Sequence, residues 1–409
     1  RRGGPSLSFL ILLAVILVPV GIVMLMRSGS RGGIGEKPEA TRPVQDPVPS
    51  PPVVPKRAWI AVDVGMATSF DSYHLCALDS KNLLYCWGDN RDGQRGDGTI
   101  DKNAFTQESP KNIGKDAWRS IAVGTGFTCG VETDGKLYCW GTNVSGQLGR
   151  GVEGFETGSR FPEKSGDDTW LMVSAGHSHA CGIKADKSLF CWGGNFFGQV
   201  GVKTKSENVP SPAKIGDNTW SAVSARDYST CGITSSSRLY CWGSNGDGVV
   251  AKTRKTQVNA PKEIPGALWR SVSLGRNHVC GIDAAKNLYC WGSNHFGQVG
   301  NGESSPPGCT SGCAFQEVPL KIGDDTWKTV AAGANTTCAI NAEGRLYCWG
   351  MSVGEGKDQT TPRKIGDETW SSVSVGTEIC AVRQDGDLFC WRPGKDHERR
   401  LVSGTSNPQ

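Results

Sequence analysis

The sequence lacks the short motifs that mark most hydrolases and nucleotide-binding enzymes. It contains no Gly-x-Ser-x-Gly elbow, no phosphate-binding loop and no His-Glu-x-x-His motif. Its glycine-rich loops of the form Gly-x-Asn-x-x-Gly-Gln are not followed by a helix whose N-terminus could bind a phosphate group. We therefore predict a chain that is not an enzyme, with no catalytic residue and no cofactor.

Histidine is scarce, with 6 residues in the whole chain. His74, His179 and His278 stand two residues before a cysteine in three repeated segments, which favours a structural hydrogen bond to a neighbouring loop. His177 and His179 would form a metal-binding pair on one face of a strand, but the sequence offers no evident third ligand. We predict no metal site.

A strongly basic surface is also absent. The chain has 44 Lys and Arg against 40 Asp and Glu, a formal net charge of +4, and the two signs are interspersed. Proteins that bind nucleic acids usually carry a Lys/Arg-rich face or stripe. The charge balance predicts no nucleic-acid partner.

Long apolar runs are limited to one, from Leu7 to Met26, which is bordered by arginine on both sides. Its length matches a helix that crosses about 30 Å of hydrocarbon. A cleaved signal peptide is the alternative, but its apolar core is about 7–15 residues long and small residues follow it. We predict a transmembrane anchor over residues 1–30 and, from the Pro, Gly and charge content, a semi-extended stalk over residues 31–52.

Tryptophan, by contrast, is plentiful and regularly placed. All 14 tryptophans fall into pairs, one opening and one closing each of seven similar segments of about fifty residues. Each segment offers an apolar strand, a hairpin, a Gly-punctuated loop and a Pro-containing edge, which together predict four short strands. Seven such all-β units without a distinct cap favour blades around an axis over an open solenoid. The opening residues are Trp59, Trp118, Trp170, Trp220, Trp269, Trp327 and Trp370, and the closing ones are Trp87, Trp140, Trp192, Trp242, Trp291, Trp349 and Trp391.

The repeated pattern G-x-x-H-x-C-G-[IV], continued by L-[YF]-C-W-G-x-N-x-x-G-Q-[LV]-G, is clearest from Gly176 to Gly201 and from Gly275 to Gly300. This pattern resembles the RCC1-repeat superfamily of seven-bladed β-propellers, over Trp59 to Trp391. The resemblance implies an all-β propeller, placed here at residues 53–394 with a C-terminal tail at 395–409. It does not imply one function, because relatives include an exchange factor for a small GTPase, a secreted β-lactamase inhibitor and outer domains of receptor kinases.

Closure of the ring requires an outer strand for the last unit. Units one to six each end in a Pro-containing edge segment, which is missing after Trp391. Such a segment precedes the first unit, so we predict that Val53 to Lys56 pairs with the seventh unit. Arg399 to Ser403 is the competing choice for the same edge.

The 16 cysteines follow the same repeat, with one Cys-x9-Cys pair in each unit. The nine intervening residues centre on a turn, so the two cysteines stand opposite each other on adjacent strands, near disulfide spacing. Buried free thiols and zinc ligation are the alternatives. An even count that is paired in every repeat predicts disulfides, and hence an oxidising space outside the cytosol: a periplasm, secretory lumen or cell surface. The pairs are Cys76–Cys86, Cys129–Cys139, Cys181–Cys191, Cys231–Cys241, Cys280–Cys290, Cys338–Cys348 and Cys380–Cys390, with Cys309–Cys313 in the longest insertion.

Seven of the 12 phenylalanines lie between the repeated segments, where we predict loops. Aromatic side chains on long loops are common anchors of protein interfaces. The alternative is that each ring folds back onto its own unit. The predicted partner surface comprises Phe105, Phe155, Phe161, Phe196, Phe197, Phe296 and Phe315.

These observations predict a non-catalytic interaction or scaffolding subunit, held outside a membrane as an accessory subunit of a membrane complex, with its N-terminus cytoplasmic. The first alternative is a receptor, ligand-binding or enzyme-inhibitor module at a cell surface. A hydrolase using the central channel would need clustered carboxylates or a His–metal site there. GTPase exchange is disfavoured by the predicted disulfides, which do not persist in the cytosol.

Overall fold

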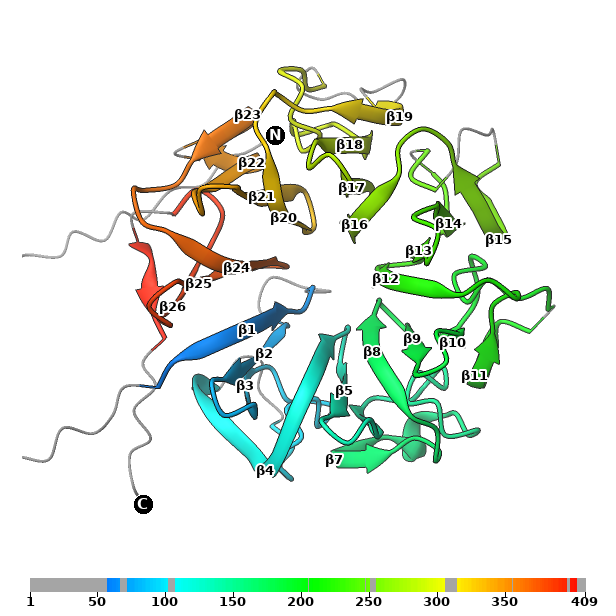
Figure 1. Cartoon of the computed structure of the whole chain (residues 1–409). Coiled ribbons are helices and arrows are strands. Elements are labelled where there is room, and N and C mark those ends of the chain that lie inside the picture. Colours follow the sequence, from blue (N-terminus) through cyan, green and yellow to red (C-terminus); the bar gives the residue numbers. More distant parts are fainter. Residues whose placement is uncertain are drawn as a thin grey trace, which may run out of the picture. The chain divides into compact units, whose positions relative to one another are not determined.

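The computed structural model describes residues 57–402 apart from 67–71, 102–106, 205, 247, 251–254, 306–314, 355 and 396–397. Within this part, short antiparallel strands form six hydrogen-bonded sheets that are arranged around a central axis (Figure 1). The fold is therefore all-β and propeller-like, and in each four-stranded sheet the strands run outward from the axis in chain order.

The first sheet contains seven strands because one of them, β4, belongs to two repeats. The first part of β4 pairs with β3, whereas its second part, from Trp118 to Val123, pairs with β5. The strands of this sheet are β1 (Trp59–Val64), β2 (His74–Asp79), β3 (Leu83–Gly88), β4 (Gln107–Val123), β5 (Phe127–Glu132), β6 (Leu137–Gly141) and β7 (Ser159–Lys164), with a short 3₁₀ turn, η1 (Phe155–Thr157), before β7.

The other five sheets have four strands each. They comprise β8 (Trp170–Ala175), β9 (His179–Lys184), β10 (Leu189–Gly194) and β11 (Asn208–Lys214); β12 (Trp220–Arg226), β13 (Ser229–Thr234), β14 (Leu239–Ser244) and β15 (Gln257–Ile264); β16 (Trp269–Leu274), β17 (His278–Asp283), β18 (Leu288–Ser293) and β19 (Phe315–Lys321). The last two sheets hold β20 (Trp327–Ala332), β21 (Thr336–Asn341), β22 (Leu346–Gly354) and β23 (Lys357–Lys364); β24 (Trp370–Val375), β25 (Ile379–Arg383), β26 (Leu388–Trp391) and β27 (Arg400–Leu401).

The repeated cysteines and tryptophans build the core of each repeat. The two cysteines of a Cys-x9-Cys pair lie directly opposite each other on the second and third strands, as Cys181 and Cys191 do, and the seven described pairs are bonded with Cα atoms 4.0–4.2 Å apart. The two tryptophans of a repeat pack at an angle, with ring centroids 5.6 Å apart for Trp170 and Trp192. Cys309 and Cys313 lie outside the described residues.

The predicted closure of the last sheet is wrong. Its outer strand is β27, in which Arg400 pairs with Cys390 and Leu401 with Phe389, whereas Val53 to Lys56 lie outside the described residues. Val402 is buried, and its N–H donates to the carbonyl of Leu388 (2.8 Å). The isoleucine of the repeated Lys-Ile-Gly segment makes the same bond in other repeats, as Ile365 does to Leu346. Arg400–Leu401 of the expected tail at 395–409 therefore form the outer strand of the last sheet.

The prediction of a single-pass membrane protein is also corrected. Among the described residues, no helix is long and apolar enough to cross a membrane. The segment from Leu7 to Met26, for which the anchor was predicted, lies outside those residues. The predicted topology, with the propeller held outside a membrane, and the role in a membrane complex depended on that anchor, and neither is supported.

Candidate functional site

Loops collect at one end of each sheet, here called the loop end. Because neighbouring strands are antiparallel, the turn between the first two strands and the connection between the last two leave at this same end. In repeats 1 to 5 an asparagine organises that connection, since its side-chain oxygen accepts an N–H from five residues further on at 2.9–3.1 Å. These residues are Asn90, Asn143, Asn195, Asn245 and Asn294.

Each such connection also accepts a hydrogen bond from a tryptophan of the next repeat. The indole N–H of Trp192, for example, donates to the carbonyl of Gln147 at 2.9 Å, and four other closing tryptophans make the equivalent bond. The loops are therefore held by two sets of hydrogen bonds and present their outward side chains in fixed positions. Such rigid presentation suits recognition, because little conformational entropy is lost on binding.

The three recurring histidines form part of the same inter-repeat bonding. The Nε2 atom of each lies within 2.6–2.9 Å of a threonine hydroxyl of the next repeat. That hydroxyl donates at 2.8 Å to the carbonyl of a loop glutamine. Burial lowers the pKa of all three histidines to about 3, so they are uncharged at neutral pH. The pairs are His74 with Thr128, His179 with Thr230, and His278 with Thr337.

The structure separates the predicted phenylalanines into two groups. Phe155, Phe161, Phe196 and Phe315 are exposed by 86, 57, 64 and 48%, whereas Phe197 and Phe296 are half-buried. The prediction that all of them lie on loops is wrong in part, because Phe161 lies in β7 and Phe315 opens β19. Phe105 falls outside the described residues.

Four rings at the loop end form a continuous row, here called the aromatic patch. Centroid separations are 5.0 Å from Phe196 to Phe197, 5.0 Å from Phe197 to Tyr228, and 4.8 Å from Tyr228 to His177. The row joins two repeats, since Tyr228 lies in the turn between β12 and β13. Sequence reasoning missed Tyr228, although Arg226-Asp227-Tyr228 visibly departs from the glycine that begins this turn in the other repeats.

The charges beside the patch are partly buried. Burial raises the pKa of Asp227, against the charges of Arg276 and Arg226, which lower it. Burial and Arg276 both lower the pKa of His177. Arg276, in the turn between β16 and β17, is itself exposed. The charge of Arg276 thus acts on His177 and on the half-buried carboxylate of Asp227, whereas the Arg226 guanidinium donates to carbonyls across the channel.

Replacing the two phenylalanines separately should give unequal results. Phe196→Ser should leave the melting temperature nearly unchanged, because the ring is mostly in solvent. Phe197→Ser should cost about 1–2 kcal/mol, because its ring contacts both Phe196 and Tyr228. Thermal unfolding of the two variants, measured side by side, tests this order. Equal losses would mean that Phe196 also packs into the fold.

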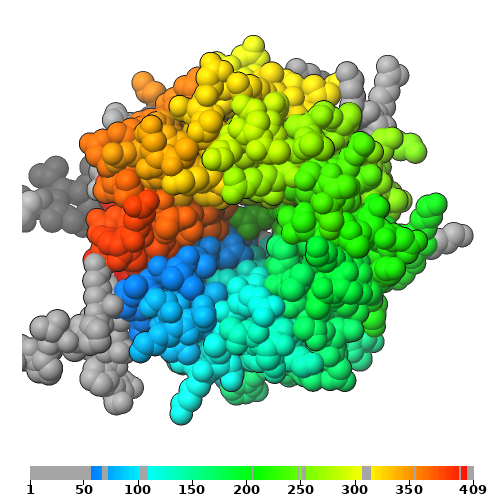
Figure 2. All heavy atoms as spheres, viewed as in Figure 1, coloured from blue at the N-terminus to red at the C-terminus, as the bar shows by residue number. Residues whose placement is uncertain are grey.

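The central channel is built from the first strands of the sheets. A serine on each of four inner strands accepts an N–H from the inner strand of the next repeat, which satisfies the otherwise unpaired edge of that strand. These bonds measure 2.9–3.2 Å and involve Ser174, Ser224, Ser273 and Ser374. The channel encloses about 430 Å³, and Figure 2 shows the hollow in the middle of this face.

One carboxylate, Asp63, is found among the described residues that line the channel. It accepts hydrogen bonds from the Ser374 hydroxyl (3.1 Å) and the Val123 N–H (2.8 Å). The guanidinium of Arg226 crosses the channel and donates to the carbonyls of Val64 (3.2 Å) and Val375. These groups bond to one another and to strand ends, so the channel holds the sheets together and offers no clustered carboxylates for hydrolysis.

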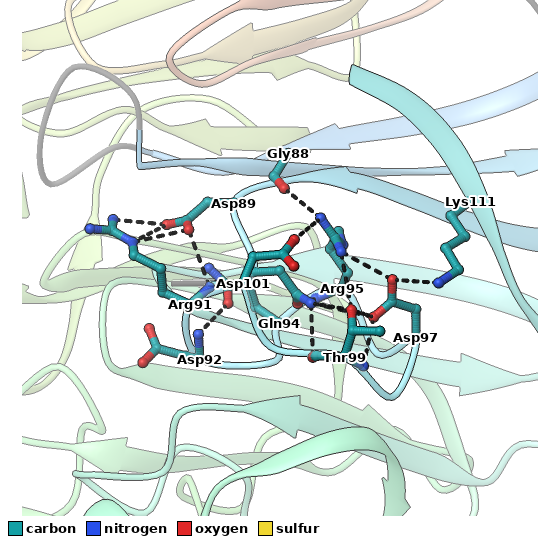
Figure 3. A network of polar contacts seen from close by, with 11 residues as sticks. Gly88, Asp89, Arg91, Asp92, Gln94, Arg95, Asp97, Thr99, Asp101 and Lys111 are labelled. Atoms are coloured by element: carbon teal, nitrogen blue, oxygen red, sulfur yellow. Dashed lines mark hydrogen bonds and ion pairs between the residues drawn. The ribbon is translucent and has the colours of Figure 1, made fainter. Parts of the chain in front are cut away.

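A second charged group that the sequence did not reveal lies in the first repeat (Figure 3). Arg95 is buried where other repeats have Leu148 or Val200. Its guanidinium pairs with Asp97 (3.2 Å) and Asp101 (2.8 Å). Although burial raises the pKa of Asp97, hydrogen bonds from Thr99 and Lys111 and the charge of Arg95 lower it to about 2. This network replaces an apolar contact with ion pairs and fixes the loop.

Two further features of the described residues resemble binding sites. Glu378, Cys380 and Cys390 cluster within metal-binding distance, but both sulfurs belong to the Cys380–Cys390 disulfide and cannot act as thiolate ligands.

A groove of about 1100 Å³ lies beside β15 and β19, where Leu268 is 59% exposed. There Pro265-Gly266-Ala267-Leu268 replaces the Gly-Asp-containing turn of other repeats.

A family model for the regulator of chromosome condensation (RCC1) repeat matches six segments of the chain, and a second RCC1-repeat model matches residues 134–183. The six segments are 72–94, 118–147, 173–199, 220–249, 269–298 and 327–353.

Among curated proteins, the mouse X-linked retinitis pigmentosa GTPase regulator is 30% identical over 159 residues, covering 37% of this chain and 15% of that protein. The human probable E3 ubiquitin-protein ligase HERC4 is 25% identical over 137 residues, covering 34% of this chain and 13% of that protein. The chain thus matches only a small part of the length of these relatives.

Solved structures give the same assignment for the fold. Human WBSCR16 aligns with a TM-score of 0.67 at 18% identity, covering 80% of this chain and 95% of that one. Yeast RCC1 (Prp20), in a structure bound to Kap60, aligns with a TM-score of 0.68 at 20% identity, covering 78% and 79%. Six segments of this chain thus match the RCC1 repeat, and its all-β, propeller-like fold is similar to that of these solved proteins.

Proposed function

We propose that the chain is a closed, seven-bladed propeller that works as a non-catalytic protein-interaction module. The repeats number seven in the sequence, and β4 supplies both the outer strand of the first and the inner strand of the second. The first and last sheets also bond to each other. The N–H of Trp59 donates to the carbonyl of Gly386 (2.8 Å), and the N–H of Thr377 donates to that of Gly65 (3.2 Å).

The observation that carries the proposal is the exposure of large aromatic side chains on a rigid frame. Phe155 and Phe196 are 86% and 64% exposed, and both lie in loop-end connections that asparagine side chains hold in place. Exposed apolar side chains on ordered loops favour a partner that covers them. The polar groups of the channel, in contrast, are engaged with one another.

The solved relatives support the same class of function. One structure of the yeast protein is described with Kap60 bound, and another with its binding properties to Gsp1p and histones. The curated relatives are a GTPase regulator and ubiquitin-type ligases whose length extends far beyond the matched region. Protein binding by the yeast relative, which has a similar fold, supports the proposal.

An affinity purification with the full chain tests the proposal. The tagged wild type is compared with a variant in which Phe155, Phe161, Phe196 and Phe315 are changed to Ser. We expect the wild type to retain a partner at a fixed ratio through washing, and the variant to lose it by about tenfold or more at an unchanged melting temperature. Equal recovery by both proteins, or no partner at a fixed ratio, would contradict the proposal.

A further inference from the structure

The most exposed large apolar side chain among the described residues lies in the loop-end connection of repeat 2. Phe155 is 86% exposed, and Val152, three positions earlier, is 49% exposed. The Asn143 side chain donates to the Val152 carbonyl (2.9 Å), and the Gly154 N–H donates to the Asn143 carbonyl (3.0 Å). Residues 152–156, here called the knob, therefore present an apolar ring to solvent in a fixed position.

The knob carries negative charge on both sides of its ring. Glu153 and Glu156 are exposed, and neither pairs with another residue in the part of the chain that the structure describes. The nearby cation Arg150 is already paired with Glu163. Arg160 is exposed as well, but it lies on β7, where its Cα and Cβ pack against the connection of repeat 1. The charge next to the ring is thus negative.

An apolar groove lies on a different part of the molecule, beside β15 and β19. It holds about 1100 Å³, and its lining includes Leu268 (59% exposed), Val318 (44% exposed) and the half-buried ring of Tyr289. Contiguous exposed apolar surface marks interaction sites. Since pockets of about 300–1,000 Å³ accept drug-sized molecules, this groove has room for an aromatic ring together with a neighbouring aliphatic side chain.

Three acidic side chains line the groove, and each already has an interaction within the chain. Glu263 pairs with Arg238 (2.6 Å). Asp283 is buried and accepts hydrogen bonds from the Asn287 N–H (2.8 Å) and from the Asn287 side-chain amide (2.9 Å). Glu317 also has an interaction partner in the chain. The acidic groups of the groove are therefore compensated.

Two exposed lysines supply the remaining charge at the groove. Lys262 lines it, and Lys286 directly follows Ala285, which lines it too. Neither lysine pairs with another of the described residues. The groove thus combines an apolar lining with a positive rim, and the knob combines an apolar ring with two flanking carboxylates. Such apolar contacts with opposite charges at the rim favour association.

The knob and the groove belong to opposite ends of the fold. The knob lies at the loop end, between β6 and β7, whereas the groove is lined by residues 265–268 and 284–285, from connections that leave at the other end. They cannot meet within one copy. We propose that the knob of one copy enters the groove of a second copy, so that the chain associates head to tail. This inference goes beyond the proposed function, because the occupant is a second copy and not a different protein.

Sedimentation velocity of the full chain, from about 1 to 300 µM, tests the inference. We expect the sedimentation coefficient of the wild type to rise with concentration. Phe155→Ser and Leu268→Ser should each raise the dissociation constant about tenfold or more. Each of these variants keeps the surface that the other lacks, so an equimolar mixture of the two should form pairs and no larger assemblies. Ile100→Ser, which removes another exposed apolar side chain (52%), should leave the association unchanged.

A charge exchange tests the rim separately from the apolar contact. Glu156→Lys should weaken the association several-fold, and Lys262→Glu should do the same. Combining the two substitutions in one chain should restore much of the loss, because opposite charges then face each other again. The wild-type association should also weaken as salt is raised. The melting temperature of every variant is measured in parallel, so that a loss of association is separated from a loss of folding.

Several results would overturn the inference. A wild-type sedimentation coefficient that stays constant up to about 300 µM would do so, as would an association that survives both Phe155→Ser and Leu268→Ser. A mixture of these two variants that forms no pairs would show that the knob does not enter the groove. None of these results bears on a partner recovered by affinity purification, so the proposed function would stand.

Discussion

Lowering the pH from 7 to 5 is expected to weaken this fold steeply, because three buried histidines must remain uncharged. The pKa of His74, His179 and His278 is lowered from 6.5 to about 3, in each case mainly by burial. In the unfolded chain each imidazole binds a proton near pH 6.5, whereas in the folded chain it does so only near pH 3. Between these values the unfolded state holds more protons, so stability falls as the pH falls.

The size of the effect follows from the number of histidines. Each contributes about 1.4 kcal/mol per pH unit once the unfolded imidazole is protonated, so the three together contribute about 4 kcal/mol per pH unit below pH 6. A domain of this kind has a total stability of about 5–15 kcal/mol. The free energy of unfolding, measured with urea at pH 7, 6 and 5, should therefore fall by a large fraction over this range.

A matched variant isolates one histidine from the rest. In repeat 2 the equivalent position is Phe127, which is fully buried, so this place in the fold accepts an aromatic ring. His278→Phe should reduce the pH slope by about one third, whereas His295→Gln, in a loop-end connection, serves as the control that keeps all three buried imidazoles. An unchanged slope in His278→Phe would show that this imidazole does not set the acid sensitivity.

The strand order and register within each repeat could be predicted from the sequence, because the residue patterns that specify them are local. A Cys-x9-Cys segment with a turn at its centre can pair in only one register, and Cys181 indeed stands opposite Cys191. The closing tryptophan follows one residue later in every repeat, so the strand that carries it is fixed as well. Such signals are repeated seven times, which is why the all-β repeat architecture could be predicted.

The outer edge of the last sheet was mispredicted although a signal was present. Arg400-Leu401-Val402 resembles Arg363-Lys364-Ile365 of the preceding repeat, and Val402 takes the buried place of the isoleucine. The prediction relied on proline as the mark of an edge strand. The buried aliphatic residue that anchors the strand was the more reliable mark.

The aromatic patch could not be assembled from sequence because its members meet only in space. Phe197 and Tyr228 are 31 positions apart in the chain and belong to different repeats, yet their rings lie 5.0 Å apart. Their contact depends on how neighbouring sheets are oriented, which no local pattern encodes. The same holds for Arg226, whose partners Val64 and Val375 lie in the first and last sheets.

Removing the side chain of Arg226 should give the largest loss of stability of any single loop-end substitution. This residue occupies the place of a glycine in the six other repeats, such as Gly65 and Gly376. Its guanidinium donates to the ends of β1 and β24, the inner strands of the first and last sheets. Without it, those two carbonyls lose their donors and the Asp63 carboxylate loses its neighbouring cation.

The expected cost of Arg226→Ala is about 3 kcal/mol, since loss of one partner leaves a carboxylate poorly compensated in the channel. Burial raises the pKa of Asp63, and the charge of Arg226 lowers it, so the variant should raise this pKa further. A raised pKa in the folded state destabilises the fold at neutral pH, and the penalty disappears when the carboxyl is protonated in both states. The difference between wild type and variant should therefore shrink as the pH approaches 4.

Two further variants test whether the uncompensated Asp63 carboxylate causes the loss of stability in Arg226→Ala. Asp63→Asn combined with Arg226→Ala should recover part of the loss, because the uncompensated carboxylate is then gone. Arg119→Ala, at an exposed channel position where the guanidinium donates to the Thr133 carbonyl, should change stability by less than about 0.5 kcal/mol. Urea unfolding measures all three, and hydrogen exchange locates the loss in β1 and β24. If Arg226→Ala behaved like Arg119→Ala, the cross-channel bonds would not hold the first and last sheets together, and the inter-strand serine bonds alone would have to do so.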